Sequence, residues 1–577
     1  MVSCLLTSTV PMTPDRAAKR FRYQLWGLIA IWLCFLVRAL FYCSVLPLWE
    51  GYDEYSHFAF VHHLAAHGQL PDPAHTRISR EIERSMQLAP VPWDLRGLPP
   101  AYLTHEEYWE LPAAERLARQ RELLALPPAL GYDAASDGLL LYEGQQPPLY
   151  YWLFSVPLRM VASSPLPSRV LLLRVLSVLL SSLVVPLSFV VGRRVFRDAR
   201  IALNLAILVA LIPEFLLDVS RVGNESLAVV LYSVLLYLGI RLVDNPQDIR
   251  CACLFGLSLG CGLLTKAYFL TALPATLLVF AVLAIRGPDR RMKTCQGAAC
   301  ALGLALLLAG WWYWQARQST GSWSGQVDAA AASFLPPLRL VAAAREVEWL
   351  KAFDFVLMTH VWCGGWSFLQ LRSWMYHVLF FLGFVGIAGL LPWGLRRWAA
   401  TAGQATPSAR HLLVLLAFYG WLWIGVAYHV LAVFVRFHWS ASVGWYLYCA
   451  VLAEIILVVT GWSALLPDAC RPWLFPTIAG MMVALELYAT HFLLLPYYSG
   501  MIAHLPNGHL SAFHPSHAWR SGLAAILERL TANKAVGLNS TTLSLEWILF
   551  LVATAGLAAG AIWLAVLSGR QQRTQGC

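Results

Sequence analysis

Apolar runs of about 20 residues recur along the chain and limit its fold more than any other feature. A helix of this length crosses the roughly 30 Å hydrocarbon core of a bilayer, where each backbone N–H and C=O must be satisfied internally. Only 13% of the 577 residues are charged, about half the fraction usual in soluble proteins. The sequence therefore predicts an all-α polytopic membrane protein with about 12 transmembrane helices. The predicted spans are 23–46, 170–192, 201–219, 224–243, 251–265, 267–285, 296–314, 374–394, 411–435, 441–461, 472–494 and 544–568.

Basic residues gather in alternate short loops between these runs. They include Arg193–Arg200, Arg241 and Arg250, Arg286–Lys293, and Arg396–Arg410. Because lysine and arginine are retained on the cytoplasmic side, we expect both termini in the cytoplasm; the family resemblance described below implies a bacterial inner (plasma) membrane. The net charge of +10 then reflects membrane orientation, and the sequence has no soluble basic face of the kind that binds nucleic acid.

The loop pattern divides the chain into four expected regions. They are a cytoplasmic N-terminus (1–22), a first membrane module (23–316), a C-terminal membrane region (317–568) and a cytoplasmic tail (569–577). The large first outer loop, 47–148, holds 15 of the 32 acidic residues. Further outer segments are expected at 315–372 and 495–543.

Local signals within the first outer loop predict three helices. One runs from Asp53 to Gly68, with a capping residue at its start and a glycine at its end. A second surface helix is expected from Glu106 to Leu126. The third begins at Pro147–Pro148, and because its apolar run is short we expect it to lie at the membrane surface or to be re-entrant.

An adjacent Asp53–Glu54 pair opens this loop, with His57 one turn further on. Two readings remain open for the pair. A carboxylate at the outer mouth of a membrane cavity can deprotonate an acceptor hydroxyl or hold a divalent cation against a phosphate. Alternatively, Asp53 only caps the helix and Glu54 favours its first turn.

Lys266 interrupts the apolar stretch CGLLTKAYFL. A lysine inside hydrocarbon costs about 2.5–3.5 kcal/mol, so we expect it at a tight outer turn, either facing a lipid phosphate or simply reaching the membrane surface. Other charged outer turns are SRVGNES and RFHWSASVGWY, which would ring the same cavity. They contribute Arg221, Asn224, Glu225, Arg436 and His438. Four histidines of the last outer segment are expected in a solvated loop instead of a metal site: His504, His509, His514 and His517.

These motifs, in this order and on one side of the membrane, resemble the GT-C membrane glycosyltransferases, in particular the protein O-mannosyltransferase and aminoarabinose-transferase branches and their uncharacterised bacterial relatives. The matching stretches are Tyr52–His57, Gln146–Trp152, Ser220–Glu225 and Leu264–Tyr268. In the second half, Trp362 and Trp366 loosely resemble a Trp- and Gly-rich outer motif of the family. The stretch 444–447 resembles a Gly-Arg-Tyr span start, but Trp445 replaces the arginine.

The resemblance implies a GT-C-like fold and transfer of a sugar, with inversion, from a polyprenyl-phosphate donor in the outer leaflet. The acceptor would be a glycan, a lipid or a protein. Asp53 would be the general base, and Glu54 would orient the site or help to hold a divalent cation, the one cofactor considered. Lys266 and Arg436 would steady the departing phosphate; either Arg436 replaces the family arginine or the donor differs. The other residues expected to bind substrate are His57, Arg221, Glu225, Gln146 and Tyr446.

Two other functions compete with this interpretation. A transporter or flippase of lipid-linked glycans would show inverted repeats and charges near the membrane midplane, whereas the ionisable residues here gather at the outer ends of spans. A non-catalytic scaffold with the same fold is the third hypothesis, because Trp445 departs from the family pattern.

Overall fold

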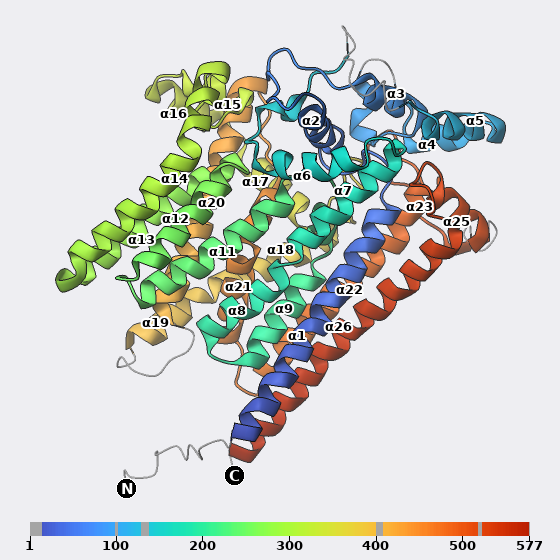
Figure 1. Ribbon diagram of the computed structural model, residues 1–577. Helices are drawn as coiled ribbons and strands as arrows, with labels where there is room; N and C mark the ends of the chain where they lie inside the picture. Colours follow the sequence, from blue (N-terminus) through green and yellow to red (C-terminus); the bar gives the residue numbers. More distant parts are fainter. Residues whose placement is uncertain (1–13, 99–101, 128–137, 400–407, 517–521, 576–577) are drawn as a thin grey trace.

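The computed structural model describes residues 14–98, 102–127, 138–399, 408–516 and 522–575. In these ranges the chain is almost entirely helical and forms no β-strand. Figure 1 shows a bundle in which the first and last long helices, α1 (Pro14–Val45) and α26 (Ser540–Gln575), run side by side. The predicted all-α membrane fold is confirmed.

Ten helical segments of the described residues are long and apolar enough to cross a membrane, so the chain is a multi-pass integral membrane protein. The spans are Phe21–Val45 of α1; Leu166–Phe196, formed by α7 (Leu166–Ser181) and α8 (Val184–Phe196); α11 (Glu225–Asp244); Ala267–Arg286, formed by η4 (Ala267–Thr271) and α13 (Ala272–Arg286); Pro288–Thr320, mostly α14 (Arg291–Thr320); Ser373–Arg396, formed by α18 (Ser373–Ala388) and part of α19 (Leu390–Ala399); α20 (Ala409–Phe437); Gly444–Leu465, formed by η6 (Gly444–Ala450) and α21 (Val451–Leu465); Arg471–Tyr498, which includes α22 (Leu474–Tyr488) and α23 (Leu495–Tyr498); and Ser540–Arg570 of α26.

By length and composition, the described residues hold ten spans, or up to eleven, close to the expected count of about 12. Two predicted spans differ from the others. The first is a pair of helices, α9 (Ala199–Leu211) and α10 (Pro213–Val219), with a bend of 66° between them. If this pair is counted as one span, the described residues hold up to 11 spans. Pro213, which lacks a backbone N–H, begins the second helix of the pair. The other is α12 (Ile249–Leu263), whose 15 residues are too few to count by length.

The first loop forms a helical layer over one end of the bundle, at the top of Figure 1. Its helices are α2 (Glu54–His67), α3 (Arg80–Leu88), α4 (His105–Glu110), α5 (Ala113–Leu124) and α6 (Leu149–Met160). The predicted positions of α2, which ends before Gly68, and of α6, which follows Pro148, are confirmed. The helix expected over 106–126 is instead two helices, because Pro112 begins a new helix after Leu111.

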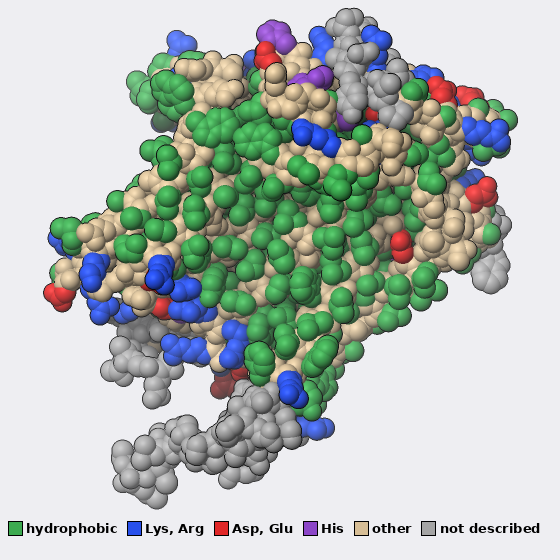
Figure 2. Space-filling model, in the orientation of Figure 1, with side chains coloured by type: hydrophobic (Ala, Val, Ile, Leu, Met, Phe, Trp, Pro, Cys, Tyr) green, Lys and Arg blue, Asp and Glu red, His purple; other side chains and the backbone are tan. Residues whose placement is uncertain are grey.

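Three short helices and a fourth near the C-terminus complete this end: α15 (Val327–Ser333), α16 (Pro337–Glu346), α17 (Trp349–Val361) and α25 (Leu523–Thr531). Figure 2 shows a broad apolar belt across the molecule, with basic side chains gathered at the end opposite the first loop. This distribution agrees with the charge pattern of the sequence. Which end faces the cytoplasm stays a prediction.

Candidate functional site

The segment that leads from α1 to α2 has an unusual backbone. Trp49 and Asp53 have φ angles of 66° and 53°, in the left-handed region that side-chain-bearing residues seldom occupy. Such conformations persist where the surroundings hold them, and they cluster at functional sites. The Trp49 side chain is fully buried, and its Nε1 donates to Ser85 Oγ at 3.0 Å.

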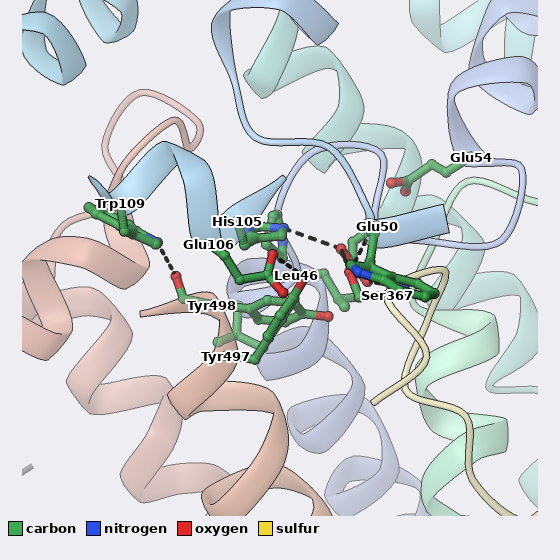
Figure 3. Close-up of polar contacts among 12 residues, drawn as sticks. Leu46, Glu50, Glu54, His105, Glu106, Trp109, Ser367, Tyr497 and Tyr498 are labelled. Carbon is green, nitrogen blue, oxygen red and sulfur yellow. Dashed lines mark hydrogen bonds and ion pairs between the residues drawn. The ribbon is translucent and has the colours of Figure 1, made fainter. Parts of the chain in front are cut away.

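Glu50 fixes the same segment to a distant loop. Its carboxylate accepts hydrogen bonds from the backbone N–H and the hydroxyl of Ser367, both at 3.0 Å, and lies 3.3 Å from His105 Nε2. Figure 3 shows Glu50 between these two residues, whereas Glu54 lies apart from the group. Glu50 thus joins the first loop to the loop that follows α17.

The Asp53 side chain does not cap the helix that it precedes. Its side chain makes no capping hydrogen bond to α2, and its carboxylate accepts none from the residues that the structure describes. Asp53 as a whole residue has intermediate solvent exposure, whereas Glu54 is fully buried. Burial raises the pKa of Asp53 to about 6, and the nearby charges of Arg221 and Lys266 oppose that rise. The capping interpretation of Asp53 is therefore wrong.

Glu54 has a different environment from its neighbour. Its carboxylate forms a two-pronged ion pair with Arg174 of α7, at 2.7 and 2.5 Å, and Oε1 also accepts the N–H of Val222 at 3.0 Å. Arg174 in turn donates to the carbonyl oxygens of Leu46 and Pro47. Both oxygens of Glu54 are engaged, so the geometry supports a positioning role and not a catalytic one.

The turns SRVGNES and LLTK come together beside Asp53, as expected. Arg221 contacts Asp218 Oδ1 and Glu225 Oε2, each at 2.9 Å, and Glu225 Oε1 pairs with Lys266. The charges of Arg221 and Lys266 also act on Asp53. With Glu143, described next, these residues form the Asp53 cluster: Asp53, Glu143, Asp218, Arg221, Glu225 and Lys266.

The close approach of these turns depends on two glycines. A Cβ atom on Gly51 would lie 2.6 Å from Arg221 Cβ, and one on Gly223 would lie 2.2 Å from Arg221 Nη1. No other residue type fits at these positions without moving the guanidinium.

Glu143 belongs to the cluster, although we did not single it out in the sequence. It is buried, and burial together with the charge of Asp53 raises its pKa to about 8, so that it holds a proton at neutral pH. His57 Nδ1 lies 3.8 Å from its carboxylate and 2.8 Å from the Tyr151 hydroxyl. Gln146 is hydrogen-bonded to Glu143, and burial lowers the pKa of His57 well below its usual range. Its place two residues before the Gln-Gln-Pro-Pro stretch is the sequence feature that could have identified Glu143 as a site residue.

Aromatic rings line the other side of Lys266. Its ammonium lies 5.5 Å from the ring centre of Tyr446 and 5.6 Å from that of Tyr268. Trp445 stacks on Tyr52, with ring centres 3.7 Å apart. Tyr52 is the residue immediately before Asp53 in the chain. Trp445 thus packs beside the cluster but brings no charge to it. Burial lowers the pKa of Lys266 to about 8, and the charge of Glu143 opposes that shift.

Arg436 does not join the cluster. It lies exposed in the last turn of α20 and forms no ion pair with any described residue; its nearest ring contact is the adjacent Phe437. The expectation that it replaces the family arginine has no geometric support. His438 follows it, exposed, at the end of the same helix.

The last outer segment is packed more closely than a solvated loop. His504 stacks on Trp93, and its Nδ1 lies 2.6 Å from Glu106 Oε1. His509 and His514 are exposed, and His517 lies outside the described residues. Across the described ranges, no three His, Cys, Asp or Glu side chains are arranged to hold a metal ion. A divalent cation held by one or two carboxylates together with a lipid phosphate stays a prediction, and no step below is routed through one.

Part of the chain matches a known protein family. Residues 145–314 match the family model of dolichyl-phosphate-mannose-protein mannosyltransferases, a segment that includes Gln146, Arg221, Glu225 and Lys266. The match confirms the resemblance to GT-C membrane glycosyltransferases that the motifs indicated. No curated protein matches the sequence.

Among solved structures, the chain is similar to ArnT from Cupriavidus metallidurans bound to undecaprenyl phosphate, with 13% identity, a TM-score of 0.42, and coverage of 95% of this chain and 76% of ArnT. It is also similar to the oligosaccharyltransferase AglB from Archaeoglobus fulgidus in complex with an inhibitory peptide and a dolichol-phosphate. That likeness has 13% identity and a TM-score of 0.38, and covers 90% of this chain and 60% of AglB. Both likenesses are distant.

Proposed function

We propose that this membrane protein, whose residues 145–314 match the mannosyltransferase family, transfers a sugar from a polyprenyl-phosphate donor to an acceptor hydroxyl, with inversion at the anomeric carbon. The observation that carries the proposal is the Asp53 carboxylate, which belongs to a partly exposed residue, is free of hydrogen bonds from the described residues, and lies beside two cations. A group in this state can accept a proton from a bound hydroxyl.

The reaction proposed for this site has one displacement step. Asp53 takes the proton of the acceptor hydroxyl as the oxygen attacks the anomeric carbon. The bond between that carbon and the phosphate oxygen breaks, and its electron pair leaves with the polyprenyl phosphate. Attack from the side opposite the phosphate inverts the configuration.

Lys266 is the group proposed to stabilise the departing phosphate. Fixed cations that meet charge as it develops lower the barrier to such a step. Its ammonium is paired with Glu225, so a bound phosphate would compete with this carboxylate or share the ammonium with it. Arg221 is held by Asp218 and Glu225 and adds positive charge to the same place.

The proposal is tested with purified protein in proteoliposomes that contain a polyprenyl-phosphate donor with a labelled sugar and, in separate arms, a glycan, a lipid or a protein acceptor. We expect labelled product and free polyprenyl phosphate in equal amounts, and NMR of the product should show the anomer opposite to that of the donor. Movement of intact donor across the bilayer would instead indicate a transporter. Neither cleavage nor movement, with a donor panel that covers the common hexoses and pentoses, would support the scaffold.

A further inference from the structure

A narrow cleft lies at the first-loop end of the bundle and shares no residue with the Asp53 cluster. It is lined by the end of α1, by α4, by the end of α23 and by the segment that leads from α25 to α26. Its polar lining residues include Tyr498, Arg529, Asn533 and Lys534, with Trp109 beside them. None of these five residues lies in the segment 145–314 that matches the mannosyltransferase family.

The cleft lies at the depth of lipid headgroups, because the ends of three spans meet there. One span ends at Val45 and another at Tyr498, and the last span begins at Ser540, a few residues after Lys534. Figure 3 shows two of the lining residues, Trp109 and Tyr498, joined by a hydrogen bond of 2.9 Å from the indole N–H to the carbonyl oxygen.

Two basic side chains line the cleft, and among the described residues no carboxylate lines it. Arg529 Nη1 donates to the carbonyl oxygen of Ser499 at 2.7 Å, and Lys534 donates to those of Val45 and Leu46. An ammonium has three N–H donors and a guanidinium five, so each side chain keeps donors that these carbonyl oxygens do not use. Burial lowers the pKa of both groups, and an anionic ligand would oppose that shift.

Two further polar groups of the cleft are buried without a partner. Tyr498 and Asn533 are 3% and 6% exposed, and neither the Tyr498 hydroxyl nor Asn533 Oδ1 has a hydrogen-bond partner among the described residues. A hydroxyl can donate to an anionic oxygen, and an amide oxygen can accept from a hydroxyl. The interior has room for about one water molecule, so a ligand can place only a small group inside and must extend outward from the mouth.

We propose that this cleft binds the phosphate group of an anionic phospholipid at the membrane surface, as a lipid site separate from that of the sugar donor. The phosphate oxygens accept hydrogen bonds from Arg529, Lys534 and the Tyr498 hydroxyl. A headgroup hydroxyl, such as those of glycerol, donates to Asn533 Oδ1. A zwitterionic headgroup binds less well, because its ammonium meets two cations and no lining carboxylate.

Native mass spectrometry of the purified full-length protein, freed of bound lipid in detergent, measures this binding. Short-chain phosphatidylglycerol and phosphatidylcholine with the same acyl chains are titrated in parallel. We expect phosphatidylglycerol to bind at a concentration at least tenfold below that needed for phosphatidylcholine. Equal binding of the two lipids would overturn the proposal.

Two competitors identify the source of the phosphate. Neither inorganic phosphate nor polyprenyl phosphate, each at the same concentration as the lipid, should displace phosphatidylglycerol. Displacement by inorganic phosphate would indicate a site for the free ion and overturn the assignment to a lipid. Displacement by polyprenyl phosphate would make the cleft part of the donor site and contradict a separate one.

Variants of the lining residues locate the bound lipid. Arg529→Gln removes one cation and should weaken phosphatidylglycerol binding by about fivefold, whereas Arg529→Lys should recover most of the affinity. Arg121→Gln, an exposed arginine on α5, is the control and should bind as wild type. Wild-type affinity in Arg529→Gln, or an equal loss in Arg121→Gln, would refute the site.

Tyr498→Phe tests the cleft without breaking a hydrogen bond of the side chain to any described residue. Its melting temperature without lipid should therefore stay close to that of wild type, while its affinity for phosphatidylglycerol should fall at least threefold. Wild-type affinity in this variant would contradict the proposal on its own, even if Arg529→Gln fails to fold.

Discussion

At the scale of single residues, Asp53 and Glu54 show how neighbours in the sequence take different roles. A Glu54→Gln substitution should leave Arg174 with a buried and unpaired charge, which costs about 3–5 kcal/mol. We expect a lower melting temperature and reduced abundance. The check is a thermal melt beside Asp53→Asn, which breaks no hydrogen bond of the described residues and should melt close to wild type. Equal melting of wild type and Glu54→Gln would contradict the positioning role.

Proton transfer by Asp53 predicts a bell-shaped dependence of transfer on pH. The pKa of Asp53 is raised to about 6, so activity should fall as the pH drops through this value and the base becomes protonated. The pKa values of Lys266 and Glu143 are both about 8, and above it the loss of either proton makes the site more negative. Activity should therefore fall again.

Lys266→Arg distinguishes these contributions, because a guanidinium does not titrate in this range. If loss of the Lys266 proton causes the alkaline limb, the limb should move to higher pH in this variant. If loss of the Glu143 proton contributes, that part of the limb should remain. The acid limb should not move in either case. The measurement is kcat/KM from pH 5 to 10. An acid limb that vanishes in Lys266→Arg would exclude Asp53 as its cause.

Residue types and topology predicted most of the cluster, but not the state of each member. Asp53, Arg221, Glu225 and Lys266 were found because charged groups next to apolar runs are rare. The burial of Glu54 depends on Arg174, 120 positions away in the chain, and no local pattern reports that contact. Arg436 was expected beside Lys266 because both were assigned to the same side of the membrane. That assignment does not determine where around the bundle a residue lies.

At the scale of elements, the last outer segment is part of the scaffold of the site. Lys534 donates to the carbonyl oxygens of Val45 and Leu46 at the end of α1, at 2.8 and 2.5 Å. A few residues further on, the chain reaches Asp53. Figure 3 shows Tyr497 and Tyr498, from the same segment, beside His105 and Glu106.

Loss of this support predicts a loss of turnover more than of substrate binding. Small displacements of catalytic groups can cost up to about 100-fold in rate, so we expect kcat of Lys534→Gln to fall by about tenfold, with the donor KM nearly unchanged. Lys534→Arg, which can still donate to both carbonyls, should recover most of the rate. The kinetics of Lys351→Gln, an exposed lysine on α17, provide the control. A Lys534→Gln enzyme with normal kcat would refute this role.

Helices with local signals were predicted well, and those shaped by tertiary contacts were not. Gly68 and Pro148 mark the ends of α2 and α6 because each acts on its own backbone. The 66° bend between α9 and α10 divides one predicted span at Pro213, a local signal that an argument from run length alone passes over.

At the scale of the whole molecule, the charge pattern predicts that the first-loop end is extracytoplasmic. In a cysteine-free background, Glu115→Cys on α5 should react with a membrane-impermeant maleimide in intact cells. Arg290→Cys, exposed at the opposite end of the bundle, should react only after permeabilisation. The reverse pattern would contradict the orientation and place the site in the cytoplasm.

The central claim is that Asp53 is the base of a sugar transfer from a lipid phosphate. Its most direct test is transfer of radiolabelled sugar from polyprenyl-phosphate donors in membranes that contain equal amounts of wild type, Asp53→Asn or Asp72→Asn. Asp72 is an exposed carboxylate of the same loop, and its substitution should leave transfer near the wild-type rate. We predict that Asp53→Asn loses at least about 100-fold in rate, the lower end of the range for general-base catalysis. Transfer by Asp53→Asn at the wild-type rate would contradict the account.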